Sequence, residues 1–139
     1  MIAKTIEYED YNGNKKKETF HFHLSEPEIN EMNYSVDGGL QDKVRRIVEI
    51  SKTADLGENE KGEMIGIIKD IILRSYGEKT ADGRFLKKSL QDGHPLRYDF
   101  EACAAFPVLY MELFQDDKAA ADFVNGIYPE KLRKAAMNG

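Results

Sequence analysis

Residues 109–129 constrain the fold most, because their pattern predicts two helices, the break between them and the point where the second one stops. Asp116 and Asp117 form the break, and either one can accept hydrogen bonds from the open amides of the next helix. Before the break, large apolar residues recur at helical spacing. They are Phe106, Tyr110, Leu113 and Phe114.

The second helix of this pair is predicted from residue 118 onward. Asn125 and Gly126 can supply a left-handed C-cap, and Pro129 prevents the helix from continuing. The stretch offers no plausible nucleophile or metal cage, so its main resource is apolar surface and the sequence favours a protein that holds something. Its helix formers and apolar packers are Ala119, Ala120, Ala121, Phe123 and Val124.

Residues 2–24 read as a β-hairpin around Asn12 and Gly13. A three-residue loop with Gly13 in the left-handed conformation sets Asp10 opposite Asn14. Unlike a two-residue turn, this register gathers the apolar side chains on one face. They are Ile2, Ile6, Tyr8, Phe20, Phe22 and Leu24.

The same register pairs charges on the other face of the hairpin. Glu7 falls opposite Lys17 and Glu9 opposite Lys15, and each pair is favourable by a few tenths of a kcal/mol. An isolated hairpin is only marginally stable, so we expect its apolar face to dock on helices or on another subunit.

A helix is predicted to begin after Ser25, because Ser25 and Glu28 have the spacing of a capping box. Leu24 and Ile29 stand where a hydrophobic staple would form, and the helix should end near Tyr34. A second helix is predicted over 40–53, with Leu40, Val44, Ile47 and Val48 on one face.

Residues 55–62 are predicted to be a polar connector, followed by a helix over 63–76 that Gly77 can end. The inward face of that helix should consist of Met64, Ile67, Ile68, Ile71 and Ile72. Residues 78–95 are turn-rich and predict a loop with a short helical turn. From Leu96 a long helix should run toward Gln115, and Pro107 inside it should kink or split it.

These elements predict a fold that is mostly α with an N-terminal β-hairpin (α+β), a small helical domain of about five helices. The chain of 139 residues fits a single domain. We expect the hairpin over 1–24, a helical body over 25–129 and a tail over 130–139 that can fray.

Charge and cysteine content narrow the class of function. The net charge is -5, with both signs scattered, which argues against general binding of nucleic acid. No run approaches transmembrane length, and the first residues lack the apolar core of a signal peptide. The single cysteine, Cys103, excludes an internal disulfide and fits a reducing compartment. We expect a soluble intracellular protein without nucleic-acid or membrane partners.

Few residues suggest a catalytic or metal-binding role. His21 and His23 place two imidazoles on one strand face, but a third metal ligand would have to be His94 or a carboxylate, and nothing indicates that one lies nearby. Cys103 sits among alanines, which favours a small buried residue over a nucleophile. The glycines within 77–83 lack the spacing of a phosphate loop. We therefore expect no catalytic residue, cofactor or metal.

Apolar side chains are in excess between residues 100 and 114, where they occupy more of the helix circumference than one core face needs. A helix that is apolar nearly all round is either central in its domain or shared with a partner, and the sequence leaves both open. The residues concerned are Phe100, Phe106, Val108, Leu109, Tyr110, Met111, Leu113 and Phe114.

Three blocks cover most of the chain: KTIEYEDYNGNKKKETFHFHLSEPEINEM, IIKDIILRSYGEKTADGRFLKKS and LYMELFQDDKAAADFVNGIYP. Together, and in this order, they resemble the tail assembly chaperones of long-tailed phages and prophages of Gram-positive bacteria. The chain departs from that pattern over 55–62 and 91–97.

The resemblance implies a non-enzymatic role in tail morphogenesis. Such proteins coat the long tape-measure protein, recruit tail-tube subunits and are absent from the finished virion, so it also implies a place in the host cytoplasm. The family's habit of self-association implies a homo-oligomer. The family often makes a longer product by programmed frameshifting as well.

A tape-measure protein is a long, largely helical chain whose uncovered apolar stripes would self-associate. Spare apolar helix surface can cover such stripes, and many weak copies along one chain would give avidity. We place this surface on seven residues, some of which must instead belong to the core: Phe106, Leu109, Tyr110, Leu113, Phe114, Phe123 and Ile127.

Two other classes of function compete with the chaperone. A structural virion component, such as a tail-tube or head-tail joining protein, is usually richer in strand than this sequence predicts. A small enzyme or metalloprotein would need a set of reactive side chains, and the sequence contains none that is recognisable.

Overall fold

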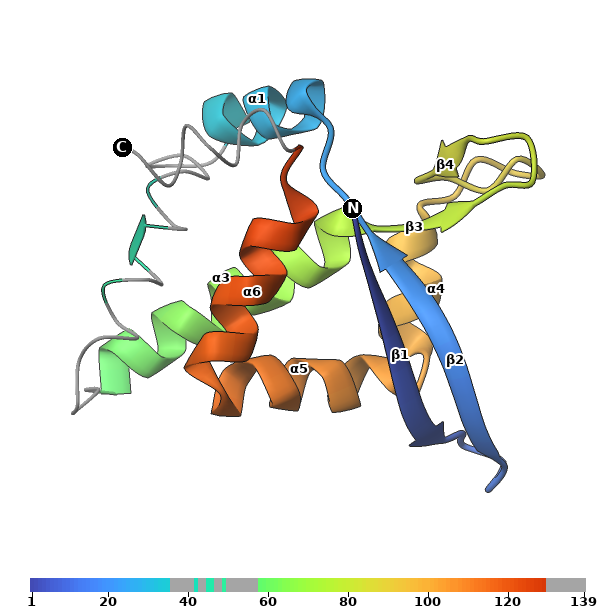
Figure 1. Ribbon diagram of the computed structural model, residues 1–139, viewed down its shortest axis with the longest axis horizontal. Helices are drawn as coiled ribbons and strands as arrows, with labels where there is room; N and C mark the ends of the chain where they lie inside the picture. Colours follow the sequence, from blue (N-terminus) through green and yellow to red (C-terminus); the bar gives the residue numbers. More distant parts are fainter. Residues whose placement is uncertain (36–41, 43–44, 47–48, 50–57, 130–139) are drawn as a thin grey trace.

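The computed structural model describes residues 1–35, 42, 45, 46, 49 and 58–129 (Figure 1). The tail over 130–139 lies outside the described residues, and so does the predicted helix over 40–53 apart from its four described positions. The strands are β1 (Ile2–Glu9), β2 (Lys15–Phe22), β3 (Tyr76–Lys79) and β4 (Phe85–Leu86). The helices are α1 (Glu26–Ser35), α3 (Glu58–Ser75), α4 (Leu96–Ala102), α5 (Ala105–Gln115) and α6 (Asp117–Ile127).

The described residues confirm the predicted fold class. They form five helices and an N-terminal antiparallel hairpin of β1 and β2. Figure 1 shows the hairpin as an arm whose tip extends beyond the helices. No helix in this part of the chain is long and apolar enough to cross a bilayer.

The hairpin has the register that the sequence predicts. The Asp10 amide donates to the Asn14 carbonyl at 2.9 Å across a three-residue loop, in which Gly13 has a φ of 84°. Further along, Lys17 Nζ lies 3.6 Å from Glu7 Oε1. The six apolar side chains of the inner face are all buried or partly buried, namely Ile2, Ile6, Tyr8, Phe20, Phe22 and Leu24.

The capping box of α1 is also confirmed. The Ser25 amide donates to Glu28 Oε1 at 3.0 Å, and the Glu28 amide donates back to Ser25 Oγ at 3.3 Å. Leu24 and Ile29 are both buried, as a hydrophobic staple requires. The helix is described as far as Ser35, next to the predicted end near Tyr34.

The α3 helix differs from the prediction at both ends. It begins at Glu58, so residues 58–62 of the predicted polar connector are helical, and it ends at Ser75 rather than Tyr76. The charged residues of the first turn carry no apolar period, which is why the sequence pattern missed them. The predicted inward side chains are all buried, namely Met64, Ile67, Ile68, Ile71 and Ile72.

Two strands, β3 and β4, were not predicted from the sequence. Tyr76 and Gly77 pair with the end of β2, and β3 then pairs with β4, so the sheet has the order β1-β2-β3-β4. The prediction that Gly77 ends a helix is therefore wrong. A Cβ on Gly77 would lie 2.6 Å from the Phe85 ring, so glycine lets the two strands approach. The loop predicted over 78–95 is also wrong where it contains strand, because pairings this short leave no alternating pattern.

Pro107 splits the predicted long helix. The α4 helix ends at Ala102, and α5 begins at Ala105. Cys103 joins them, with its amide donating to the Phe100 carbonyl at 3.0 Å. Pro107 then lies in the first turn of α5, where backbone amides have no partner within the helix and a missing N–H costs nothing.

The start of α6 follows the prediction, because the Asp116 side chain accepts hydrogen bonds from the amides of Lys118 at 3.0 Å and Ala119 at 3.2 Å. The predicted C-cap at Asn125 and Gly126 is wrong. The helix continues to Ile127, and its C-cap residue Tyr128 is extended rather than left-handed.

Gly126 serves a different purpose. A Cβ at this position would lie 2.8 Å from the Cδ1 atom of Ile2, so glycine allows β1 to lie close against α6. The Leu24 amide also donates to the Ile127 carbonyl at 2.8 Å. The end of α6 is thus bound to the hairpin at two points.

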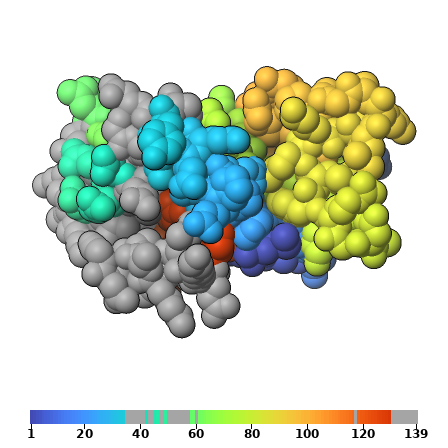
Figure 2. Space-filling view, turned by 90° about the horizontal axis from the view of Figure 1, so that it is seen from above, coloured from blue at the N-terminus to red at the C-terminus, as the bar shows by residue number. Residues whose placement is uncertain are grey.

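One hydrophobic core joins the sheet to the helices. Phe22 lies at its centre, with ring centroids 5.1 Å from Phe123 and 5.6 Å from Phe100. Phe100 also stacks on Tyr76 at 4.5 Å. Figure 2 shows the outer surface above this core, where α1 lies beside the segment that contains β3 and β4.

Candidate functional site

The α5 helix carries more apolar surface than its neighbours cover. One line along it is fully buried and consists of Ala105, Leu109 and Leu113. The adjoining line is half-buried and aromatic, and we call it the aromatic stripe: Phe106, Tyr110 and Phe114. Pro107, Val108 and Met111 extend the apolar surface into solvent. The charged and polar exceptions on this helix are Glu112 and Gln115.

The aromatic stripe is an outward continuation of the core. The Phe106 ring lies 5.9 Å from Phe100, which belongs to the core, and 6.1 Å from Tyr110. Tyr110 and Phe114 are parallel within 4° at 6.2 Å. Rings held in this way present area to a partner with little loss of side-chain entropy. Partial burial raises the pKa of the Tyr110 hydroxyl, which keeps it uncharged.

Two exposed apolar residues of α5, Val108 and Met111, stand about 60° apart around the helix and at different distances from the aromatic stripe. Met111 is 42% exposed and stands about 60° from Phe114 around the helix, next to the aromatic stripe. Val108 is 43% exposed and stands about 120° from Phe114, farther from the stripe than Met111 is. It lies one turn from Glu112, whose carboxylate accepts a hydrogen bond from Lys4 Nζ of β1 at 3.0 Å. Met111 therefore widens the aromatic stripe, whereas Val108 lies farther from it and beside the charged Glu112.

The structure sorts the seven predicted partner-binding residues into two groups. Four are at most 2% exposed and pack in this chain's own core, so their side chains are not accessible in this conformation: Leu109, Leu113, Phe123 and Ile127. The other three form the aromatic stripe. Met111 was not among the seven, although its spacing from Pro107 and Phe114 places it on the same side of the helix.

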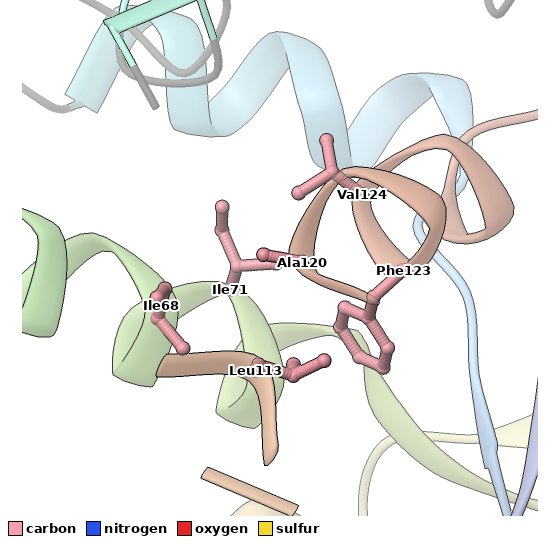
Figure 3. Close-up of a pocket in the computed structure, with 6 residues that line it drawn as sticks. All are labelled: Ile68, Ile71, Leu113, Ala120, Phe123 and Val124. Atoms are coloured by element: carbon pink, nitrogen blue, oxygen red, sulfur yellow. The ribbon is translucent and has the colours of Figure 1, made fainter. Parts of the chain in front are cut away.

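A small hollow lies between α3, α5 and α6 (Figure 3). It is apolar on all sides, so it has no group that could orient a polar ligand. The residues that line it are Ile68, Ile71, Leu113, Ala120, Phe123 and Val124.

The titratable side chains of the described residues determine whether this part of the chain could hold a metal ion. Among the described residues, no group of three or more His, Cys, Asp or Glu side chains could hold a metal ion. His23, one of the two strand histidines, has a buried Nδ1 atom without a hydrogen-bond partner, and burial lowers its pKa. His94 is instead held by two carboxylates, with Nδ1 2.5 Å from Asp92 and Nε2 2.7 Å from Asp99.

Cys103 lies half-buried at the joint between α4 and α5. Nearby, the Tyr8 hydroxyl donates to Glu18 Oε1 at 2.5 Å, and this hydrogen bond is the main cause that raises the pKa of Tyr8. A protonated phenol is a poor general base, so this arrangement does not favour activation of the thiol by Tyr8.

A rigid helix with uncovered aromatic surface is typical of a protein that holds another polypeptide. The chain belongs to the family of phage tail assembly chaperones, whose family model matches residues 1–139. No curated protein and no solved structure matches the chain significantly.

Proposed function

We propose that the chain binds the tape-measure protein of an assembling tail through the aromatic stripe and Met111, and keeps that protein soluble. The family supplies the setting, which is tail assembly. One observation supports the choice of this binding surface. The rings of Phe106, Tyr110 and Phe114 lie in a line at the surface of α5 and are fixed by the core beneath them.

The dimensions of this surface fit a helical partner. The aromatic stripe spans nine residues from Phe106 to Phe114, which corresponds to about 12 Å of helix. A partner helix lying against it would cover two to three of its own turns, and side-chain ridges of the two helices could interlock. One such contact is small, so useful affinity would come from many copies bound along one long chain.

The same proposal places the protein in the host cytoplasm during assembly, helping to recruit tail-tube subunits and absent from the finished virion. Self-association fits this role, because copies bound side by side would cover a continuous length of the partner. Mass spectrometry of purified particles tests the proposal against a structural role in the virion. Finding the chain in stoichiometric amounts in the particle would contradict it.

Co-expression with the tape-measure protein tests the surface directly. Met111→Asp and Tyr110→Asp place a charge on the aromatic stripe side, and we expect the soluble fraction of the tape-measure protein to fall several-fold. Val108→Asp is the matched control, because Val108 is exposed to the same degree but stands about 120° from Phe114 around the helix, away from the aromatic stripe. Circular dichroism should show that all three variants are folded.

The comparison of positions next to the aromatic stripe with the position farther from it decides the outcome. If folded Met111→Asp and Tyr110→Asp keep the tape-measure protein as soluble as the unchanged chain does, α5 is not the binding surface. If Val108→Asp has an equal effect, the proposed side of the helix is wrong.

A further inference from the structure

The β2 strand is longer than the strand that lies on its outer side. β3 pairs only with His21 and Phe22, and then turns away to pair with β4. Figure 1 shows β3 leaving the arm while β2 continues toward the hairpin tip. Along residues 15–20, β2 therefore has β1 on one side and, in the described part of the chain, no strand on the other.

The backbone groups along this edge can be assigned from the ladder. The His23 amide donates to the Ser75 carbonyl at 2.8 Å, on the side of β2 that β3 occupies. In an antiparallel ladder every second residue faces the same neighbour. Lys15, Lys17 and Thr19 therefore direct their N–H and C=O groups to the free edge, whereas the even-numbered residues bond to β1.

The free edge is basic. Lys15, Lys16 and Lys17 are all exposed, and Glu18 is the single acidic residue of β2. Glu7 of β1 reaches Lys17 at 3.6 Å, but β1 lies on the far side of β2. A strand added at the free edge would lie about 5 Å from β2 and about 10 Å from β1, so the lysines would dominate the field that it meets.

We infer that this edge of β2 binds an extended segment of a partner protein that carries carboxylates at alternate positions, by addition of a strand to the sheet. The main chain of residues 15–19 supplies the hydrogen bonds, and Lys15 and Lys17 select the acidic sequence. The lysines also disfavour pairing with the β2 edge of a second copy, which would bring like charges together. This site is separate from the α5 surface and does not depend on it.

Two synthetic peptides probe the edge on the full-length protein. One has eight residues alternating valine and glutamate, and the other has lysine in place of each glutamate. We expect the acidic peptide to bind at least tenfold more tightly than the basic one at low salt. In hydrogen exchange followed by NMR, the acidic peptide should slow the Lys17 and Thr19 amides and leave those of Lys16 and Glu18 unchanged.

Proline and threonine variants separate the backbone from the charge. Lys17→Pro removes one outward N–H together with the Lys17 charge, and none of the backbone hydrogen bonds to β1. We expect it to bind the acidic peptide at least tenfold more weakly than Lys17→Thr, which removes the charge alone. Replacing Lys15 and Lys17 together by threonine should abolish the preference for the acidic peptide. Lys118→Thr, a charge change on α6, should leave both properties unaltered. The Asp10 and Asn14 amide signals report whether the hairpin stays folded.

Three results would overturn the inference. Equal binding of both peptides would show that the lysines do not select an acidic sequence. Binding without slower exchange of the Lys17 and Thr19 amides would show that the peptide binds elsewhere. Concentration-dependent protection of these amides without peptide would show that a second copy of the chain occupies the edge. Retained binding by a folded Lys17→Pro variant would also contradict strand addition.

Discussion

The Lys87 ammonium donates to the main-chain carbonyl of Arg74 at 2.7 Å, so a side chain that follows β4 satisfies an acceptor at the end of α3. The same ammonium donates to the His23 carbonyl at 2.8 Å and lies 3.4 Å from Glu28 Oε2. Burial is the main cause that lowers the pKa of Lys87, and Glu28 opposes it. One cation therefore joins the ends of α3 and β2 to the first turn of α1.

Replacing this cation should destabilise the fold. Lys87→Met keeps the length of the side chain but leaves the carbonyls of Arg74 and His23 without their donor, and we expect a loss of about 1–3 kcal/mol in the free energy of unfolding. Urea denaturation followed by circular dichroism measures it. Lys88→Met is the control, because Lys88 is exposed, and it should change stability by less than about 0.5 kcal/mol. Equal effects would refute the special role of Lys87.

Two helical glycines should respond oppositely to alanine. Gly66 of α3 has nothing within 4 Å of a built Cβ, so Gly66→Ala should stabilise the protein by about 1 kcal/mol through helix propensity. Gly126→Ala places a methyl group 2.8 Å from Ile2 Cδ1 and should destabilise it by about 1–3 kcal/mol. Thermal unfolding of the two variants checks the difference in sign. A stabilising Gly126→Ala would show that β1 does not lie this close to α6.

Truncating α5 should separate core from surface. Leu109→Ala removes a side chain with 0% exposure, and we expect a loss of about 2–5 kcal/mol. Met111→Ala removes an exposed side chain and should cost less than about 1 kcal/mol. Chemical denaturation of both variants gives the comparison. Similar costs would mean that Met111 is covered, for instance by another subunit.

The pKa of His94 should depend on its two carboxylates. Asp99 and Asp92 raise it above the usual 6.5, with Asp99 the larger cause. A pKa raised by folding means that this ion pair stabilises the protein fully below the unfolded value and that the contribution is lost as pH rises through the folded pKa. An NMR titration of the His94 ring should show the raised value, and Asp99→Asn should lower it. An unchanged value in Asp99→Asn would show that the pair does not form in solution.

Elements with a strong local signal could be predicted from the sequence. The hairpin register followed from the alternation of apolar residues and from Gly13, whose φ of 84° fits the three-residue loop. The capping box at Ser25 and the aspartate cap of α6 followed from hydrogen bonds between near neighbours. β3 and β4 could not be predicted, because only tertiary pairing with β2 makes Tyr76 and Gly77 extended.

The candidate site was predictable only in part. The excess of apolar residues on α5 is visible in the sequence, but Leu113 and Phe114 are equally apolar there. Which of the two side chains is buried depends on where α3 and α6 pack against α5. The positions of these helices relative to α5 depend on the split at Cys103 and on the Asp116 cap. The free edge of β2 was equally out of reach, since it exists because β3 turns away after Gly77.

The contacts of α6 with the hairpin also bear on synthesis. Ile2 meets Gly126, and the Leu24 amide meets the Ile127 carbonyl, so partners more than a hundred positions apart close the structure. A ribosome makes the hairpin early and α6 late, and contacts of such separation form slowly. The growing chain therefore exposes part of the apolar face of β1 and β2 until α6 has been made. Completion of the fold of each copy waits for the synthesis of α6.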